Sequence, residues 1–272
     1  MVLQARDKDL LKAVNEHQAL LGRQLEALFF TSRSTAQYRL QRLFQHEFLD
    51  RQFMAAVSGG PASSPILYTL GRRGQHILLS EFGVALDHIR RFPKQLSWQF
   101  LDHLIEINDI RIAVALACQR QGFTLETWLD EPHFRANPDY VTLKDKSGKT
   151  VPKPVYPDGY FCLHVPQGKT HFFLEHDRGT EPRSKFRPQI EVYQIYTQSG
   201  GYEQRFQTRS LRILIVTTSQ ERLFNLKEVT QRAGGDRKYW FTIFDQITPE
   251  TVLTQPIWER MESNEKVALI GG

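Results

Sequence analysis

The sequence predicts an α+β protein whose first third is organised differently from the remainder. Residues 7–49 contain three short segments with apolar side chains at helical spacing, followed by two short strand-like segments. From residue 98 to residue 245, helical and strand-like segments alternate, which is typical of a mixed sheet covered by helices. A charged connector with Pro93 separates the two regions. We therefore expect two domains, residues 1–95 and residues 96–272.

Composition restricts the class of protein. The chain has 272 residues, of which 40% are hydrophobic, so it can form one large core or two modest ones. No stretch approaches the ~18 consecutive apolar residues of a membrane span, and the N-terminus lacks the apolar core of a signal peptide. A cytoplasmic protein without a membrane partner is expected. The only two cysteines, Cys118 and Cys162, lie in apolar runs, which excludes a disulfide framework and predicts buried thiols.

The positive charge is unevenly distributed along the sequence. Residues 1–95 contain 13 Lys and Arg against 8 Asp and Glu, whereas residues 96–272 contain 22 of each kind. Phosphate contacts require cationic side chains gathered on one surface, so the first third is where a polyanion would bind. A basic surface that is only solvated is the alternative interpretation of the same count.

Each element of the first third follows from its pattern. Helices are predicted over residues 7–16, 17–30 and 34–49, and the third directs Ala36, Leu40 and Leu43 inward. Residues 50–57 and 65–71 are predicted strands, the Gly, Ser and Pro residues of 58–64 form the loop between them, and residues 71–83 resume a helical pattern.

Three short helices followed by a strand pair indicate a winged helix-turn-helix whose third helix enters the major groove of double-stranded DNA, with a homodimer on a symmetric site as one arrangement. A helical protein-interaction module would show the same periodicity. Charge and position define two groups of candidate DNA-binding residues. The phosphate candidates are Arg23, Arg33, Arg72 and Arg73, and the base-edge candidates are Gln37, Tyr38, Gln41 and Arg42.

The pattern of residues 96–272 predicts a mixed α/β sheet with helices packed against it. Residues 98–121 form a long predicted helix and residues 123–131 a strand, after which the polar stretch 135–155 is either a loop or a small hairpin. Residues 156–165 and 171–177 are expected to pair as antiparallel strands. A helix at 183–199, a strand at 211–218, a helix at 220–234 and a final strand at 238–245 complete the region.

Three acidic residues stand near the ends of the paired strands. Asp158 begins one strand and Glu175 ends the other, so antiparallel pairing brings them to one end of the sheet, and Asp177 shares the face of Glu175. Two or three carboxylates can hold Mg²⁺ or Mn²⁺, which suits phosphodiester hydrolysis by an activated water. Exposed acids at strand ends, with no such role, are the common alternative.

Sequence motifs extend this interpretation. PDG at 157–159 and EHDRGT at 175–180 resemble the metal centre of the PD-(D/E)xK nuclease superfamily. The whole chain resembles the replication-relaxation family of plasmids and mobile elements, through residues 39–49, 68–74, 103–111, 157–161 and 172–180. The resemblance implies a winged helix joined to a PD-(D/E)xK nuclease-like core, a role in plasmid replication or DNA mobilisation, and a replication, relaxase or transposition protein as partner.

The chain departs from the nuclease pattern where the superfamily has a lysine, because that position is Asp177. Lys185 and Arg178 are the candidate substitutes, although Arg178 would point to the opposite strand face.

Two helices supply further candidates. Gln189 and Tyr193, at i,i+4 spacing, resemble the glutamine and tyrosine motif of RecB-like nucleases. Glu106 either completes the metal shell or forms a salt bridge with a residue such as Arg111, and His103 is expected to cap or pack.

Three functions remain open on this sequence. The first is a metal-dependent endonuclease or nickase that uses Asp158 and Glu175. The second, which the aspartate at position 177 favours, is a non-catalytic DNA-binding accessory protein that keeps the nuclease fold as a docking surface. The third is a transcriptional regulator, which would leave the larger region unexplained.

Overall fold

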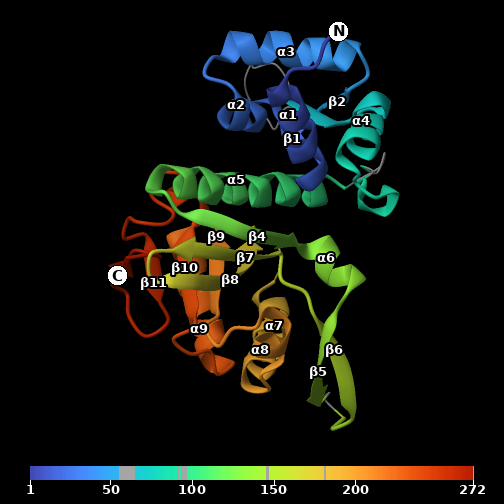
Figure 1. Cartoon of the computed structure of the whole chain (residues 1–272). Coiled ribbons are helices and arrows are strands. Elements are labelled where there is room, and N and C mark those ends of the chain that lie inside the picture. The colour runs from blue at the N-terminus through green and yellow to red at the C-terminus, as the bar shows by residue number, and fades with distance from the viewer. Residues whose placement is uncertain (55–64, 91, 93–96, 145–146, 181, 272) are drawn as a thin grey trace. The chain divides into compact units, whose positions relative to one another are not determined.

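The computed structural model describes residues 1–54, 65–90, 92, 97–144, 147–180 and 182–271 (Figure 1). It divides into two compact units, Met1–Ile112 and Ala113–Gly272, each of which is described by itself. The division lies inside one helix, α5 (Trp98–Gln121), whose first part belongs to the first unit. The expected domain boundary near residue 95 stays a prediction.

The first unit is helical with a small antiparallel sheet. The strands are ordered β1-β3-β2, and Leu49–Phe53 pairs along its whole length with Ile66–Leu70. The predicted connecting loop, residues 58–64, lies outside the described residues. The elements are α1 (Ala5–Glu16), β1 (Leu20–Leu21), α2 (Gly22–Phe29), α3 (Arg33–Gln45), β2 (Leu49–Phe53), β3 (Ile66–Leu70), α4 (Arg72–Phe82) and η1 (Leu86–His88).

One predicted element is divided in two. Residues 17–30 were expected to form a single helix, but Leu20 and Leu21 form a short strand opposite Tyr68 and Leu67, and the helix begins at Gly22. Gln18 has a φ of 65°, a left-handed conformation that interrupts a right-handed helix. Burying both leucines in the sheet outweighs the helical periodicity of the segment.

The first part of α5 completes the core of this unit. Leu101 and Ile105 pack with Ala19, Leu21 and Leu67 in one buried cluster. An amphipathic helix is stable only when its apolar face packs against another element. The first part of α5 is such an element for this unit. These contacts explain why the compact unit includes the first part of α5.

The second unit is a mixed seven-stranded sheet with helices, ordered β12-β11-β10-β9-β8-β7-β4. A separate two-stranded hairpin, β5-β6, lies beside it. The elements after α5 are β4 (Thr124–Asp130), α6 (Glu131–Ala136), β5 (Asp139–Lys144), β6 (Thr150–Val155), β7 (Gly159–Val165), β8 (Gly168–Asp177), α7 (Arg183–Gln198), α8 (Gly201–Phe206), β9 (Arg212–Thr217), α9 (Gln220–Arg232), β10 (Tyr239–Ile243), η2 (Phe244–Gln246), β11 (Trp258–Arg260) and β12 (Lys266–Val267).

The register of the central strands places the predicted acidic residues. β7 and β8 pair antiparallel, with Gly159 opposite Leu174, whereas β8 and β9 run parallel, with Glu175 opposite Ile215. Phe173 packs with residues of α7 and with Ile213 and Phe241 in one buried cluster. Because alternate strand residues share a face, Glu175 and Asp177 lie on this helix-covered face.

Most predicted elements of this unit are confirmed. The helix 98–121 has the predicted ends, and the polar stretch 135–155 contains a hairpin rather than only a loop. Helices α6 and α8 and strands β11 and β12 were not predicted. Cys118 and Cys162 are free and buried, as expected. None of the helices in the described ranges has the length and apolar character that a membrane crossing requires.

Candidate functional sites

Helix α3 presents a polar row on its outer side. Ala36, Leu40 and Leu43 are buried, while Gln37 is exposed and Tyr38 keeps 67% of its surface in solvent. The i, i+4 and i+7 spacing of the buried residues fixes which side of the helix faces outward. A polar, aromatic and exposed helix face of this kind can reach base edges in a DNA groove.

The strand pair supports one end of this helix. Arg51 of β2 donates to the side-chain oxygen of Gln41 at 2.6 Å and stacks over the ring of Phe44. Gln41 and Arg42 are only partly exposed, so they lie at the margin of the outer face. Arg51 was not among the residues predicted from the sequence. The available signal was its position in a predicted strand, where it lies on the opposite face from its two exposed neighbours.

The two arginines that begin α4 differ in their surroundings. Arg72 is exposed and forms an ion pair with Glu47 at 2.9 Å. Arg73 stacks over the ring of Phe48, with its guanidinium carbon 4.5 Å from the ring centre. An exposed ion pair contributes little to stability, so the guanidinium of Arg72 can exchange Glu47 for a phosphate at low cost.

Arg23 is held by an acidic partner. Its guanidinium donates two hydrogen bonds to the Asp109 carboxylate, at 2.5 and 2.6 Å. Gln24 donates to the same carboxylate and to the Ile105 carbonyl oxygen. The bidentate geometry occupies the guanidinium, so Arg23 ties α2 to α5 in the first unit and is poorly suited to bind phosphate. Local sequence pattern did not indicate Asp109 as its partner, since the two residues are 86 positions apart.

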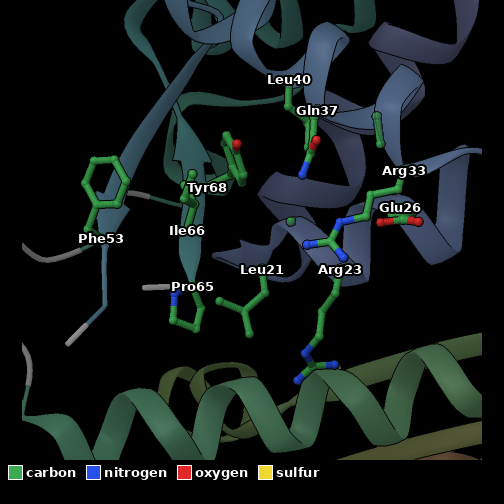
Figure 2. Close-up of a pocket in the computed structure, with 12 residues that line it drawn as sticks. Leu21, Arg23, Glu26, Arg33, Gln37, Leu40, Phe53, Pro65, Ile66 and Tyr68 are labelled. Carbon is green, nitrogen blue, oxygen red and sulfur yellow. The ribbon is translucent and has the colours of Figure 1, made fainter. Parts of the chain in front are cut away.

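A pocket of about 580 Å³ opens between the start of α2, the start of α3 and β3. Figure 2 shows Arg33 and Gln37 of α3 directed toward it, whereas Arg23 points toward α5. Phe53, Ile66 and Tyr68 form its strand side. The pocket therefore combines a cationic and an amide side chain with an apolar wall.

In the second unit, Glu175 is enclosed by two residues of α7. The Tyr193 hydroxyl and the Gln189 side-chain amide each donate to a different carboxylate oxygen of Glu175, and the amide bond is 2.5 Å long. Only 4% of Glu175 is exposed. Glu175 thus bonds to both residues of the glutamine and tyrosine motif, because their i,i+4 spacing puts both on the face that meets β8.

Asp158 stands close enough to influence Glu175. Burial raises the pKa of Glu175 well above its usual value, and the negative charge of Asp158 raises it further, while the bonds from Tyr193 and Gln189 oppose the rise. The Asp158 carboxylate accepts the backbone N–H of His176 at 2.7 Å. Burial and the neighbouring carboxylate therefore both favour the protonated form of Glu175, whereas a bound divalent cation would favour its ionised form.

Asp177, in the position of the superfamily lysine, faces a different partner. Its carboxylate accepts two hydrogen bonds from the Arg222 guanidinium, at 2.8 and 2.9 Å, and one from the Thr217 hydroxyl. Arg222 lies in the first turn of α9, which follows the strand paired with β8. The signal that could have identified Arg222 is that α9 directly follows β9 in the sequence. Because β9 runs parallel to β8, α9 begins at the end of the sheet where β8 ends.

The remaining predicted site residues lie in other parts of the chain. Glu106 belongs to the part of α5 in the first unit, and Arg111 pairs with Glu16. Lys185 lies in α7, but its side chain is outside the described residues. Within the described ranges, no group of three or more His, Cys, Asp or Glu side chains is arranged to hold a metal ion. Asp158 and Glu175 fit Mg²⁺ as a two-carboxylate set, whereas Asp177 fits only if it leaves Arg222.

Comparison with known proteins assigns the family. No curated protein and no solved structure matches the chain significantly. The model of the replication-relaxation family matches residues 11–209, which include α3, the β7-β8 pair and all of α7. The match covers more than half of the sequence and agrees with the motifs identified in it. The chain belongs to the replication-relaxation family.

Proposed function

We propose that this protein is a DNA-binding accessory protein of plasmid or mobile-element replication or mobilisation, and that it contacts duplex DNA through α3. The family supports a role in replication or mobilisation. The observation that carries the DNA contact is the outer face of α3, where Gln37 and Tyr38 are exposed while Leu40 and Leu43 anchor the helix.

The surrounding elements support this assignment. The order α1, β1, α2, α3, β2, β3 with an antiparallel sheet is that of a winged helix, in which the third helix reads the major groove. Arg33, the first residue of α3, and the exposed Arg72 are suited to phosphate contacts. We exclude Arg23 from that set because Asp109 occupies it.

The experiment is a selection of duplexes from a random pool with the full chain, followed by affinity measurement on the selected sequence. The double variant Gln37→Ala, Tyr38→Ala should lose most of the preference for that sequence over a scrambled duplex, since each good base contact contributes about 1–3 kcal/mol. Gln204→Ala, an exposed glutamine of the second unit, is the matched control. Equal preference in the double variant and the control would contradict the assignment.

A second candidate function is metal-dependent cleavage of DNA. Its supporting observation is the buried Glu175, held by Tyr193 and Gln189 beside Asp158. Asp158 and Glu175 would hold a divalent cation, which would supply an activated water and stabilise the leaving oxygen. The accessory role is preferred because Asp177 and its partner Arg222 stand where the superfamily has its lysine.

Cleavage is tested with supercoiled plasmid and Mg²⁺ or Mn²⁺. A nuclease would nick the plasmid, and both Asp158→Asn and Glu175→Gln would abolish nicking. The control Glu191→Gln removes an ion pair with Arg187 on α7 and would leave nicking unchanged. An accessory protein would leave the plasmid intact under all of these conditions while still binding the selected duplex.

A further inference from the structure

The β5-β6 hairpin packs against the core through one face and leaves the residues of its other face exposed. Val141 and Val155 are buried in the core cluster with α7, and Tyr196 and Arg205 both contact the Asp139 carboxylate. Figure 1 shows the ribbon extending away from the seven-stranded sheet. We name this ribbon, residues 139–144 and 150–155, the arm.

The arm exposes cationic and aromatic side chains. Tyr140 keeps 61% of its surface in solvent, and Thr142 and Lys144 follow it on the same exposed face. Lys153 is exposed on the other face, in register with Val141. Lysines thus project from both faces of one narrow ribbon.

The charge of the second unit is consistent with a polyanionic partner. Residues 113–272 contain 21 Lys and Arg against 19 Asp and Glu, and the buried pair Lys227 with Glu259 cancels within the fold. At the base of the arm, Asp139 is likewise neutralised by Arg205. The exposed charge along the described part of the arm is therefore positive.

The edge of the arm does not suit an added strand. Pro152 and Pro154 lie opposite Thr142 and Tyr140 in β6. A proline has no N–H to donate and is tolerated only where that position faces away from the ladder. The outer edge of β6 thus lacks two donors that a partner strand would need, which favours recognition of this edge through side chains rather than backbone pairing.

We propose that the arm is a second contact to duplex DNA, in which Lys144 and Lys153 bind phosphates and Tyr140 lies against the nucleotide surface. This inference rests on the proposed DNA-binding function. A two-stranded ribbon fits a major groove about 12 Å wide. Lysines on both faces then approach the phosphate backbones that border the groove. An acidic protein surface is the competing partner.

The last residue of the arm is close in sequence to Asp158, one of the acidic pair. β6 ends at Val155, three residues before Asp158, and Asp130 at the end of β4 pairs with Gly159 at the start of β7. Glu175 follows Leu174, the partner of Gly159 across the sheet. The base of the arm is therefore close in sequence to the end of the sheet that carries Asp158 and Glu175.

The test compares salt dependence in the full chain. The double variant Lys144→Gln, Lys153→Gln should bind the selected duplex with a Kd whose rise between 50 and 200 mM salt is about tenfold smaller than in the wild type, since two phosphate contacts are lost. Base preference should stay unchanged. The matched control is Lys238→Gln, Lys266→Gln. Lys238 precedes β10, at the sheet end opposite Glu175.

The outcomes separate the arm from α3. If the arm variant keeps the wild-type salt dependence while the α3 variant loses base preference, the arm inference is wrong and the proposed function stands. That result would point to the acidic protein surface. If the arm variant changes the salt dependence while the α3 variant keeps its preference, the assignment of α3 is wrong and the arm inference stands.

A direct readout uses a tethered cleaving reagent. Cys118 and Cys162 are buried, so a new thiol on the arm is the accessible site for attachment. A reagent attached to Lys153→Cys should cut the selected duplex at one fixed position. Cleavage no greater than that from the same reagent on Lys238→Cys would overturn the inference.

Discussion

His17 illustrates how a single buried residue ties the first unit together. Its Nδ1 donates to the Asn108 side-chain oxygen at 2.9 Å, and the Asn108 amide donates back to the carbonyl oxygens of His17 and Ala19. Both side chains are buried. Burial, followed by the charge of Arg111, lowers the pKa of His17 from 6.5 to about 3, although the hydrogen bond to Asn108 opposes the shift.

The first prediction is acid sensitivity of this unit. The unfolded chain takes up a proton on His17 below pH 6.5, whereas the folded chain resists it down to about pH 3, so stability falls as the pH falls through that range. At pH 5 the cost is about 2 kcal/mol. In urea unfolding followed by circular dichroism, His17→Gln should flatten the loss between pH 6.5 and 4, whereas the exposed His88→Gln should not.

The second prediction concerns Glu175 without divalent cations. Because its folded pKa is raised above the unfolded value of 4.5, the folded state retains the proton longer, and stability falls as the pH rises above 4.5. In chelator, Glu175→Gln should therefore raise the free energy of unfolding more at pH 8 than at pH 5. The exposed Glu191→Gln is the control. No gain at pH 8 would show that Glu175 is not strained by its burial.

At the scale of single residues, the sequence identified candidate site residues better than it identified which residues bond to one another. It selected Asp158, Glu175, Gln189 and Tyr193, and the last three do share hydrogen bonds. It could not foresee that Arg222, 45 positions beyond Asp177, would bind that aspartate. Such a pairing depends on parallel strand order, which local periodicity does not encode.

At the scale of elements, strongly periodic segments were predictable and short ones were not. The helix 98–121 was predicted to its ends, since its 24 residues contain few breakers. β1 has 2 residues and exists only through its pairing with β3. β12, also of 2 residues, depends on β11 in the same way. Tertiary pairing decides such segments, so their own sequence is a weak guide.

The third prediction tests how α4 packs. A Cβ on Gly74 would lie 2.2 Å from the Phe48 carbonyl oxygen and 3.2 Å from side-chain atoms of Leu11 and Leu70. Gly74→Ala must therefore push α4 away from β3 and should cost about 1–3 kcal/mol in urea unfolding. At Gly22 an added Cβ meets only Tyr68 at 3.5 Å, so Gly22→Ala should be neutral or stabilising. Equal stability of both variants would argue against this close approach.

At the scale of the whole molecule, the position of the boundary changes the meaning of the charge distribution. Counted to residue 95, all the excess positive charge lies in the first part. Counted over the compact units, residues 1–112 have 14 Lys and Arg against 11 Asp and Glu, and residues 113–272 have 21 against 19. Both units are therefore mildly basic, so two separate DNA contacts are electrostatically reasonable.

The fourth prediction follows from the same boundary. A fragment of residues 1–112 should fold, because it keeps Ile105, Asn108 and Asp109 with their partners in α2 and the α1-β1 connection. A fragment of residues 1–95 lacks all three and should be largely unfolded. Amide hydrogen exchange of Leu20 and Leu21 measures this directly. Equal protection in both fragments would support a domain boundary near residue 95 and contradict this prediction.

The sheet order of the second unit has a consequence for synthesis on the ribosome. Parallel pairing of β8 with β9 waits for α7 and α8, and the sheet is complete only when Lys266–Val267 has been made. Non-local pairings of this kind form slowly. The first unit ends at Ile112. Since chains fold from the N-terminus as they emerge, we expect nascent chains to carry a finished α3 face while most of the sheet is still unmade.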